Sequence, residues 1–165
     1  MFRIAPVMAI VFLAQPMLMP SASAQAATTN SSILVTATVL SSCTIAASAL
    51  PFGNYSVVAL AVNTSIIVAC TATTPYNVAL SAGAGTGASV TTRQMTGASG
   101  VTPLNYGLFR NAGFTQNWGV TSSTDTVAGV GNGLPQTLTV YGQVPANQLV
   151  TPALYTDTVV ATLTY

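Results

Sequence analysis

The sequence of 165 residues has very few charged side chains, with three basic residues, two acidic residues and no histidine. Lysine and glutamate are also absent. A nucleic-acid partner is not expected, because phosphate binding requires a basic surface. A Ser-His-Asp triad would lack its histidine, and the usual pair of glycosidase carboxylates would lack glutamate. We therefore expect no enzymatic activity and no cofactor or bound metal.

The remaining charged and aromatic residues fit structural roles better than a binding site. Asp125 lies in the hydroxyl-rich segment TSSTDT and Asp157 heads a predicted strand, so both are expected to accept hydrogen bonds in turns. Arg93 and Arg110 are expected at the surface or paired, because isolated charges are usually solvated. Trp118 and the six tyrosines could form a sugar-stacking platform, but packing in a core or sheet is their ordinary role.

Long apolar runs are absent after the first residues of the chain. Residues 1–24 combine Arg3, an apolar stretch and the small residues Ala22-Ser23-Ala24, which is the pattern of a secretory signal peptide. Residues 6, 15 and 16 (Pro, Gln and Pro) interrupt the stretch, so a membrane anchor fits less well. We predict that the chain is exported and that its mature part is one domain.

Cysteine is scarce, and the two cysteines present are Cys43 and Cys70. In an exported protein an even pair predicts a disulfide, which would contribute roughly 3–4 kcal/mol by restricting the unfolded chain. The alternative is a catalytic or metal-binding thiol pair. It is disfavoured because the spacing is not that of a metal site and the chain has no histidine.

The mature region has no helical period and consists of short alternating segments separated by Gly, Pro and Asn. This pattern indicates an all-β fold, either an antiparallel sandwich or a barrel. A turn is predicted at Asn132-Gly133. Strands are predicted in residues 31–40, 64–72, 76–83 and 155–165. Residues 104–114 are predicted as a strand that enters a turn at 111–113, and residues 130–144 as the turn at 132–133 followed by a strand through Val140.

The first and last predicted strands have matching patterns. Ile33, Val35, Ala37 and Val39 fall on one face of the first strand, and Val159, Ala161, Leu163 and Tyr165 fall on one face of the last. The last strand needs a second neighbour, which could be the first strand of the same molecule or that of another copy. Burial of the four apolar residues of the first strand would contribute about 1–3 kcal/mol each. The alternation alone fits both pairings.

A series of motifs along residues 31–165 resembles the spore coat protein U family, which includes the pilins of archaic chaperone–usher systems. The order and spacing of the motifs carry the resemblance more than any one of them does. The motifs are SSCTIAASALPFGNY (41–55), Cys70 after a Val-rich strand, RQM (93–95), LNYGLFRN (104–111), Trp118-Gly119, TVYGQVPANQ (139–148) and YTDTVVATLTY (155–165).

The resemblance implies an incomplete immunoglobulin-like antiparallel β-sandwich that is completed by a donor strand. Residues 25–40 would be the N-terminal donor extension and residues 41–165 the sandwich domain, with the edge beside 157–165 forming part of an acceptor groove. The implied partners are other pilus subunits, a periplasmic chaperone and an outer-membrane usher. The resemblance also implies passage through the periplasm and a final place in an extracellular fibre at the cell surface. Two other functions remain open: a lectin-like tip or secreted binding module, and a structural protein of a spore or cyst coat.

Overall fold

The computed structural model describes residues 25–98 and 101–165, which contain β-strands and no helix. The signal peptide predicted for residues 1–24 lies outside the described residues. Within the described ranges, no helix could span a bilayer. Backbone contacts divide the chain into two units, Met1–Ala37 and Thr38–Tyr165. We call residues 25–40 the extension and residues 41–165 the body, and describe each separately.

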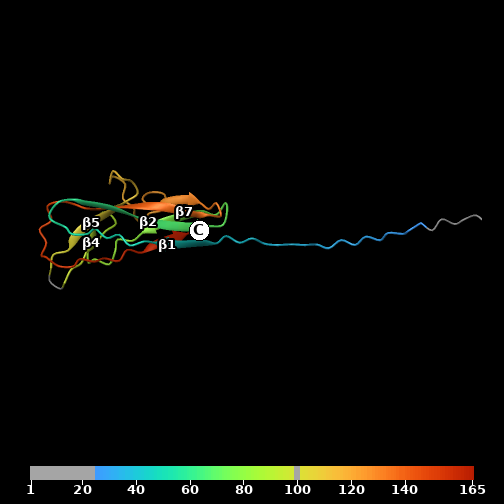
Figure 1. Ribbon diagram of the computed structural model, residues 1–165, viewed down its shortest axis with the longest axis horizontal. Helices are drawn as coiled ribbons and strands as arrows, with labels where there is room; N and C mark the ends of the chain where they lie inside the picture. The colour runs from blue at the N-terminus through green and yellow to red at the C-terminus, as the bar shows by residue number, and fades with distance from the viewer. Residues whose placement is uncertain (1–24, 99–100) are drawn as a thin grey trace, which may run out of the picture. The chain divides into compact units, whose positions relative to one another are not determined.

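The body is a sandwich of two antiparallel sheets (Figure 1). The larger sheet has the order β1-β2-β7-β5-β4 and the smaller has the order β6-β3-β8. The all-β antiparallel sandwich predicted from the sequence is confirmed. The strands are β1 (Cys43–Ala47), β2 (Leu60–Cys70), β3 (Pro75–Leu80), β4 (Arg93–Met95), β5 (Leu104–Phe109), β6 (Val127–Val130), β7 (Pro135–Val144) and β8 (Ala161–Thr164).

The alternating sequence of the strands produces the core between the two sheets. In β2, Ile66 and Val68 are buried while the intervening Ile67 is 42% exposed, because successive side chains point to opposite faces of a sheet. β3 and β7 bury alternate residues in the same way. The buried apolar residues are Ile66, Val68, Cys70, Tyr76, Val78, Leu80, Met95, Leu104, Tyr106, Leu108, Trp118, Val140 and Val144.

A turn and a buried tryptophan complete the body as the sequence predicted. Gly133, in the turn predicted at Asn132-Gly133, has a positive φ of 80°, which glycine adopts without steric cost. Trp118 is 1% exposed and its indole N–H donates to the carbonyl of Val78 at 2.9 Å. The packing role predicted for Trp118 is therefore confirmed, and its ring is not available to stack on a sugar.

Strand β1 is joined to β2 both by its ladder and by a covalent bond. Cys43 lies directly opposite Cys70 in the register of the two strands, with their Cα atoms 4.1 Å apart. The two cysteines form a disulfide, which confirms the prediction from the sequence. Because β1 is an edge strand with β2 as its single ladder partner among the described residues, this bond fixes one border of the larger sheet.

Replacing both cysteines, Cys43→Ala with Cys70→Ala, is expected to lower the free energy of unfolding by about 3–4 kcal/mol. The reason is that the unfolded chain regains the freedom that the cross-link removed. Urea unfolding of the mature chain, compared with a Thr44→Ala variant on the neighbouring position of β1, measures the difference. A loss of less than about 1 kcal/mol would show that the β1–β2 ladder does not depend on the bond.

The extension carries no strand, although its sequence predicted one over residues 31–40. Its large apolar side chains, among them Ile33, Val35 and Val39, are exposed. An isolated strand is not stable in water, because its backbone groups and its apolar face both need a neighbour. The pairing partner predicted for this segment is therefore not supplied within the described residues.

Candidate functional site

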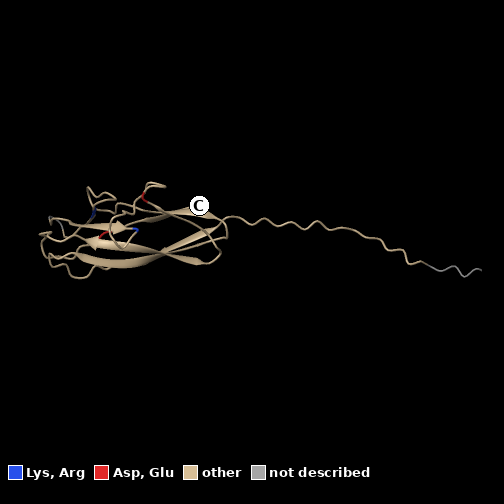
Figure 2. Ribbon diagram, turned by 90° about the horizontal axis from the view of Figure 1, so that it is seen from above, with Lys and Arg blue, Asp and Glu red and all other residues tan. Residues whose placement is uncertain are grey.

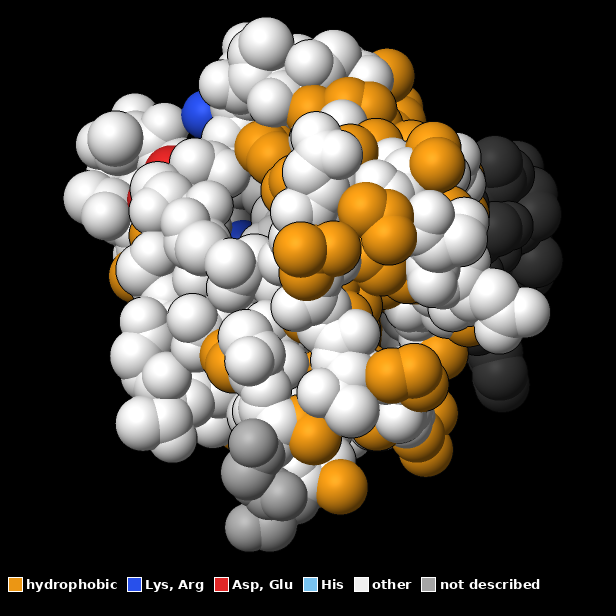
Figure 3. Space-filling model, turned by 90° about the vertical axis from the view of Figure 1, so that its left-hand side faces the viewer, with side chains coloured by type: hydrophobic (Ala, Val, Ile, Leu, Met, Phe, Trp, Pro, Cys, Tyr) orange, Lys and Arg blue, Asp and Glu red, His pale blue; other side chains and the backbone are white. Residues whose placement is uncertain are grey.

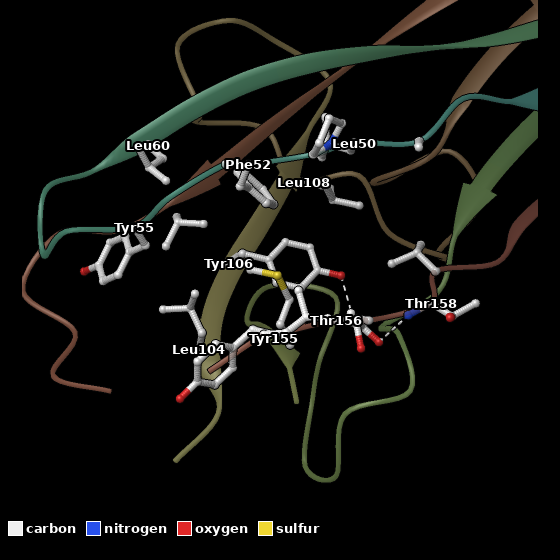
Figure 4. A pocket seen from close by; sticks show the side chains of 18 of the residues that line it. Leu50, Phe52, Tyr55, Leu60, Leu104, Tyr106, Leu108, Tyr155, Thr156 and Thr158 are labelled. Atoms are coloured by element: carbon white, nitrogen blue, oxygen red, sulfur yellow. Dashed lines mark hydrogen bonds between the residues drawn. The ribbon is translucent and has the colours of Figure 1, made fainter. Parts of the chain in front are cut away.

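A long groove with an apolar floor opens into the core of the body (Figure 4). One wall is the segment after β1, residues 48–57, and the other is the segment before β8, residues 148–160. The volume of the groove is about 1400 Å³. Its floor is built by the core residues Ile66, Leu80, Met95, Leu104, Tyr106, Leu108, Val140 and Val144.

The wall after β1 contributes backbone groups that lack partners. Within residues 25–98 and 101–165, no hydrogen bond reaches the backbone N–H or C=O groups of residues 50–56. The side chains of Leu50 and Phe52 turn into the groove from this wall, and Phe52 packs edge-on against Tyr106 with ring centroids 5.8 Å apart (Figure 4). This wall therefore offers both apolar contacts and unpaired hydrogen-bonding groups.

The opposite wall also combines apolar contacts with unpaired backbone groups. The Val160 carbonyl accepts from the Ser81 N–H at 3.0 Å, and the Val160 N–H donates to the Ser81 Oγ at 2.9 Å, so residue 160 bonds toward β3. Successive backbone groups of a strand point to opposite edges, so the N–H and C=O of Val159 and Ala161 point away from β3. β8 pairs with β3 alone among the described residues, which leaves this edge free.

The structure brings some of the predicted edge residues into the groove and leaves others outside it. Val159 and Ala161 line the groove. Leu163 packs against the core without lining the groove, and Tyr165 is 58% exposed. The groove lining ends at Ala47 and Ala161, where β1 and β8 come close to each other. The assignment of this edge as an acceptor site stays a prediction.

A hydrogen-bonded cluster fixes the loops at the other end of the groove. The Tyr55 hydroxyl donates to the Pro145 carbonyl and accepts from the Gln148 N–H, both at 2.9 Å. The Gln148 side-chain amide accepts from the Asn105 N–H at 2.7 Å and donates to the Asn105 carbonyl at 2.9 Å. Gln148 therefore makes the two backbone hydrogen bonds that a neighbouring strand would make to Asn105 of β5. Tyr55 connects the first wall of the groove to Gln148 at the start of the second. No pattern in the sequence indicated this cluster.

A partly buried carboxylate, that of Asp157, belongs to the wall formed by residues 148–160. The Tyr106 hydroxyl donates to Asp157 Oδ2 at 2.6 Å, and the Thr158 N–H donates to Asp157 Oδ1 at 2.7 Å (Figure 4). Asp157 Oδ1 also accepts from the Ala84 N–H at 2.7 Å. Asp125 accepts from the Thr121 N–H. Both aspartates thus accept hydrogen bonds from loop backbone, as predicted. Asp157 fixes the start of the segment that leads into β8.

The position of Arg93 corrects an expectation from the sequence. It is 0% exposed, although we expected a surface or paired residue. Its guanidinium donates to four backbone carbonyls, and burial lowers its pKa below the ordinary value. The four acceptors are the carbonyls of Leu80 (3.1 Å), Ser81 (2.8 Å), Val90 (2.8 Å) and Trp118 (2.7 Å).

Arg93 supplies hydrogen-bond donors at a place where several backbone carbonyls meet. The end of β3, the loop before β4 and the Trp118 loop all point carbonyls inward at one place, and a guanidinium has five N–H donors in a fixed plane. Elsewhere the body is almost free of charge, as Figure 2 shows. Arg110 behaves similarly nearer the surface and donates to the carbonyls of Thr124 and Thr126.

Replacing Tyr106 with Phe is expected to destabilise the body by about 1–3 kcal/mol at neutral pH, because the Asp157 carboxylate loses a donor. Burial, followed by the hydrogen bond to Asp157, raises the pKa of the Tyr106 hydroxyl above its ordinary value. The folded chain holds this proton more tightly than the unfolded chain does. The corresponding stabilisation of the folded state is therefore complete below about pH 10 and is lost as the pH rises further. The variant should therefore lose less stability than the natural chain above that pH.

Tyr141→Phe is the matched control for this prediction. The Tyr141 side chain is half-buried in β7, and no hydrogen bond joins its hydroxyl to the described residues. Urea unfolding at neutral pH and above pH 10 compares the two variants. If the free energy of unfolding depended on pH in the same way in Tyr106→Phe and Tyr141→Phe, the Tyr106–Asp157 hydrogen bond would not be the source of the predicted effect.

The groove has features that suit the binding of an extended polypeptide. Its walls offer unpaired backbone groups along two edges, and its floor offers apolar pockets for alternate side chains, which is the recognition mode of strand addition. Among residues 25–98 and 101–165, no group of His, Cys, Asp or Glu side chains has the arrangement of a metal site.

The comparisons with known proteins agree with this geometry. No curated protein matches the chain. Among solved structures, it is similar to the CsuC–CsuE chaperone–tip adhesion subunit pre-assembly complex from archaic chaperone–usher Csu pili of Acinetobacter baumannii, with a TM-score of 0.60 and 25% identity. The match covers 78% of this chain and 41% of the other chain, so this chain corresponds to less than half of that protein.

A family model covers most of the sequence. The model of the Spore Coat Protein U domain matches residues 29–162 and therefore includes part of the extension together with almost the whole body. This match confirms the resemblance drawn from the motifs between Cys43 and Tyr165. The chain belongs to the Spore Coat Protein U domain family.

Proposed function

We propose that this protein is a structural, non-enzymatic subunit of an extracellular pilus that assembles by donor-strand exchange. The extension of one subunit occupies the groove of the next, and repetition of this step builds the fibre. The observation that carries the proposal is the groove itself, whose two walls present free backbone groups above an apolar floor. A strand laid between the walls would complete the sandwich.

The extension has the properties that such a strand needs. Every second position from 33 to 39 is apolar, so one face of the extended strand is apolar. These residues are Ile33, Val35, Ala37 and Val39. Burial of these side chains contributes about 1–3 kcal/mol each, and each new backbone hydrogen bond adds about 0.5–1.5 kcal/mol. The cost of ordering a free segment offsets part of this gain.

The proposal includes partners that act before the fibre forms. An open groove leaves the backbone groups of its two walls unpaired, so a subunit in transit needs a temporary strand in the same place. The similar solved structure is described as a chaperone–subunit pre-assembly complex, which supports a periplasmic chaperone in this role. An outer-membrane usher would then exchange the chaperone for the next subunit. The fibre would serve surface attachment or biofilm formation.

The test is to express the mature chain with and without residues 25–40. The proposal predicts that the truncated chain is unstable or remains bound to a chaperone, and that a peptide of residues 28–40 restores a stable, folded species. A peptide with Val35→Asp should fail, whereas one with Thr36→Asp on the opposite face should still bind. A truncated chain that is a stable monomer and ignores the peptide would disprove donor-strand exchange.

A further inference from the structure

Two groups of exposed apolar side chains lie near the two ends of the body. The mouth patch consists of Val57, Val58, Leu149 and Leu154, and Leu149 and Leu154 are 86% and 83% exposed. Three of its members, Val57, Leu149 and Leu154, also line the groove. Figure 3 looks onto this end, the left-hand end of Figure 1, and shows hydrophobic side chains crowded over one part of it.

The second patch surrounds the start of the body. The root patch consists of Val130, Leu134 and Tyr165, each more than half exposed. Val130 pairs with Pro75 at the start of β3, and the Gly133 N–H donates to the carbonyl of Cys70, the residue bonded to Cys43. β2, with 11 residues, separates the two patches, because Leu60 lies near the mouth patch and Cys70 near the root patch.

The lining of the groove includes residues of the mouth patch and none of the root patch. Its lining ends at Ala47 and Ala161, where β1 and β8 lie close together. At the other end it is bordered by Leu149 and Leu154, which are largely exposed. The chain that follows an inserted strand therefore leaves the groove past the mouth patch.

The length of the extension then places the two bodies in contact. Three residues, 40–42, separate Val39, the last inward residue of the inserted strand, from Cys43 at the start of the donor's own body. Four peptide steps span at most about 14 Å. The donor's root patch, which surrounds Cys43, is therefore brought against the mouth patch of the acceptor. Neither patch contains a charged residue, so no like charges oppose the contact.

We propose that the mouth patch binds the root patch of a second copy of this chain. The proposal rests on the proposed function, because the inserted extension brings the two patches together. The contact joins different surfaces of the two copies, so it repeats without closing and lengthens the fibre in one direction. It also explains why a body with so few charges keeps large apolar side chains at both ends.

Photo-crosslinking of assembled mature chains tests the interface. A photoreactive amino acid is placed at Leu149 in one variant and at Leu154 in another, and cross-linked peptides are identified by mass spectrometry. We expect cross-links from either position to residues 130–134, to residues 71–75 or to Tyr165 of a neighbouring chain. The same label at Ile67, which is 42% exposed in the middle of β2, should give none of these products.

The outcomes separate the interface from the proposed function. Fibres that form normally but give no cross-links from the mouth patch, or cross-links to the middle of a neighbour's sheets, overturn the interface and leave donor-strand exchange standing. Chains that form no fibres and whose truncated form ignores the peptide of residues 28–40 overturn the proposed function and the interface with it. Cross-links from Leu149 or Leu154 to a neighbour's root patch support both.

Discussion

Replacing Val35 with Asp in the mature chain is expected to abolish assembly, whereas replacing Thr36 with Asp is expected to leave it almost unchanged. Val35 belongs to the apolar face of the extension and Thr36 to the opposite face. The variant loses about 1.5–3 kcal/mol of side-chain burial and also places a carboxylate in an apolar groove, which costs several kcal/mol more. At about 1.4 kcal/mol for each tenfold change, binding of the extension weakens by about a thousandfold or more.

Light scattering or electron microscopy of refolded, purified chains measures this effect. Both variants introduce the same charge one residue apart, so a general effect of charge on solubility would change them equally. Equal assembly of the Val35 and Thr36 variants would mean that the extension does not enter the groove through the face predicted here.

Replacing Arg93 with Met is expected to lower the free energy of unfolding by about 3–5 kcal/mol. The substitution leaves four backbone carbonyls without the donors that the guanidinium supplied, in a site that water does not reach. A loss of this size is a large part of the total stability of an ordinary domain, about 5–15 kcal/mol. Arg93→Lys should recover part of the loss, since an ammonium offers three donors in place of five.

The fluorescence of Trp118, which is the single tryptophan and is buried beside this cluster, reports the unfolding in urea. Arg110→Met is the control, because the Arg110 guanidinium donates to two carbonyls at a more exposed position. If both variants unfolded at the same urea concentration, the buried cluster would not be the determinant of stability that its hydrogen bonds indicate.

The longer strands could be predicted from the sequence, because each alternates over enough residues to define an inner face. β2, β3, β5 and β7 lie within or overlap the predicted segments, and the disulfide follows from two cysteines in an exported chain. β4 and β6 could not be predicted from alternation, since they have three and four residues and, unlike β8, do not belong to a longer alternating segment. Tertiary pairing with β5 and β3 determines them instead.

The candidate site could be predicted in part. The alternation of residues 155–165 indicated an edge that needs a neighbour, and Val159 and Ala161 do line the groove. The other wall, residues 50–56, lacks alternation and appeared only as a family motif, so its unpaired backbone had no signal in the sequence. The burial of Arg93 could not be predicted from the sequence either, because its four acceptors come from segments that meet only in the folded body.

The central claim is that the groove is filled by the extension of another molecule and not by the molecule's own. Hydrogen exchange of the amides of residues 33–39, measured separately on one-chain species and on assembled chains, tests it most directly. We predict that these amides are protected in the assembled chains and exchange freely in the one-chain species. Protection of the same amides in a stable one-chain species would show that the extension fills its own groove, and would contradict the account.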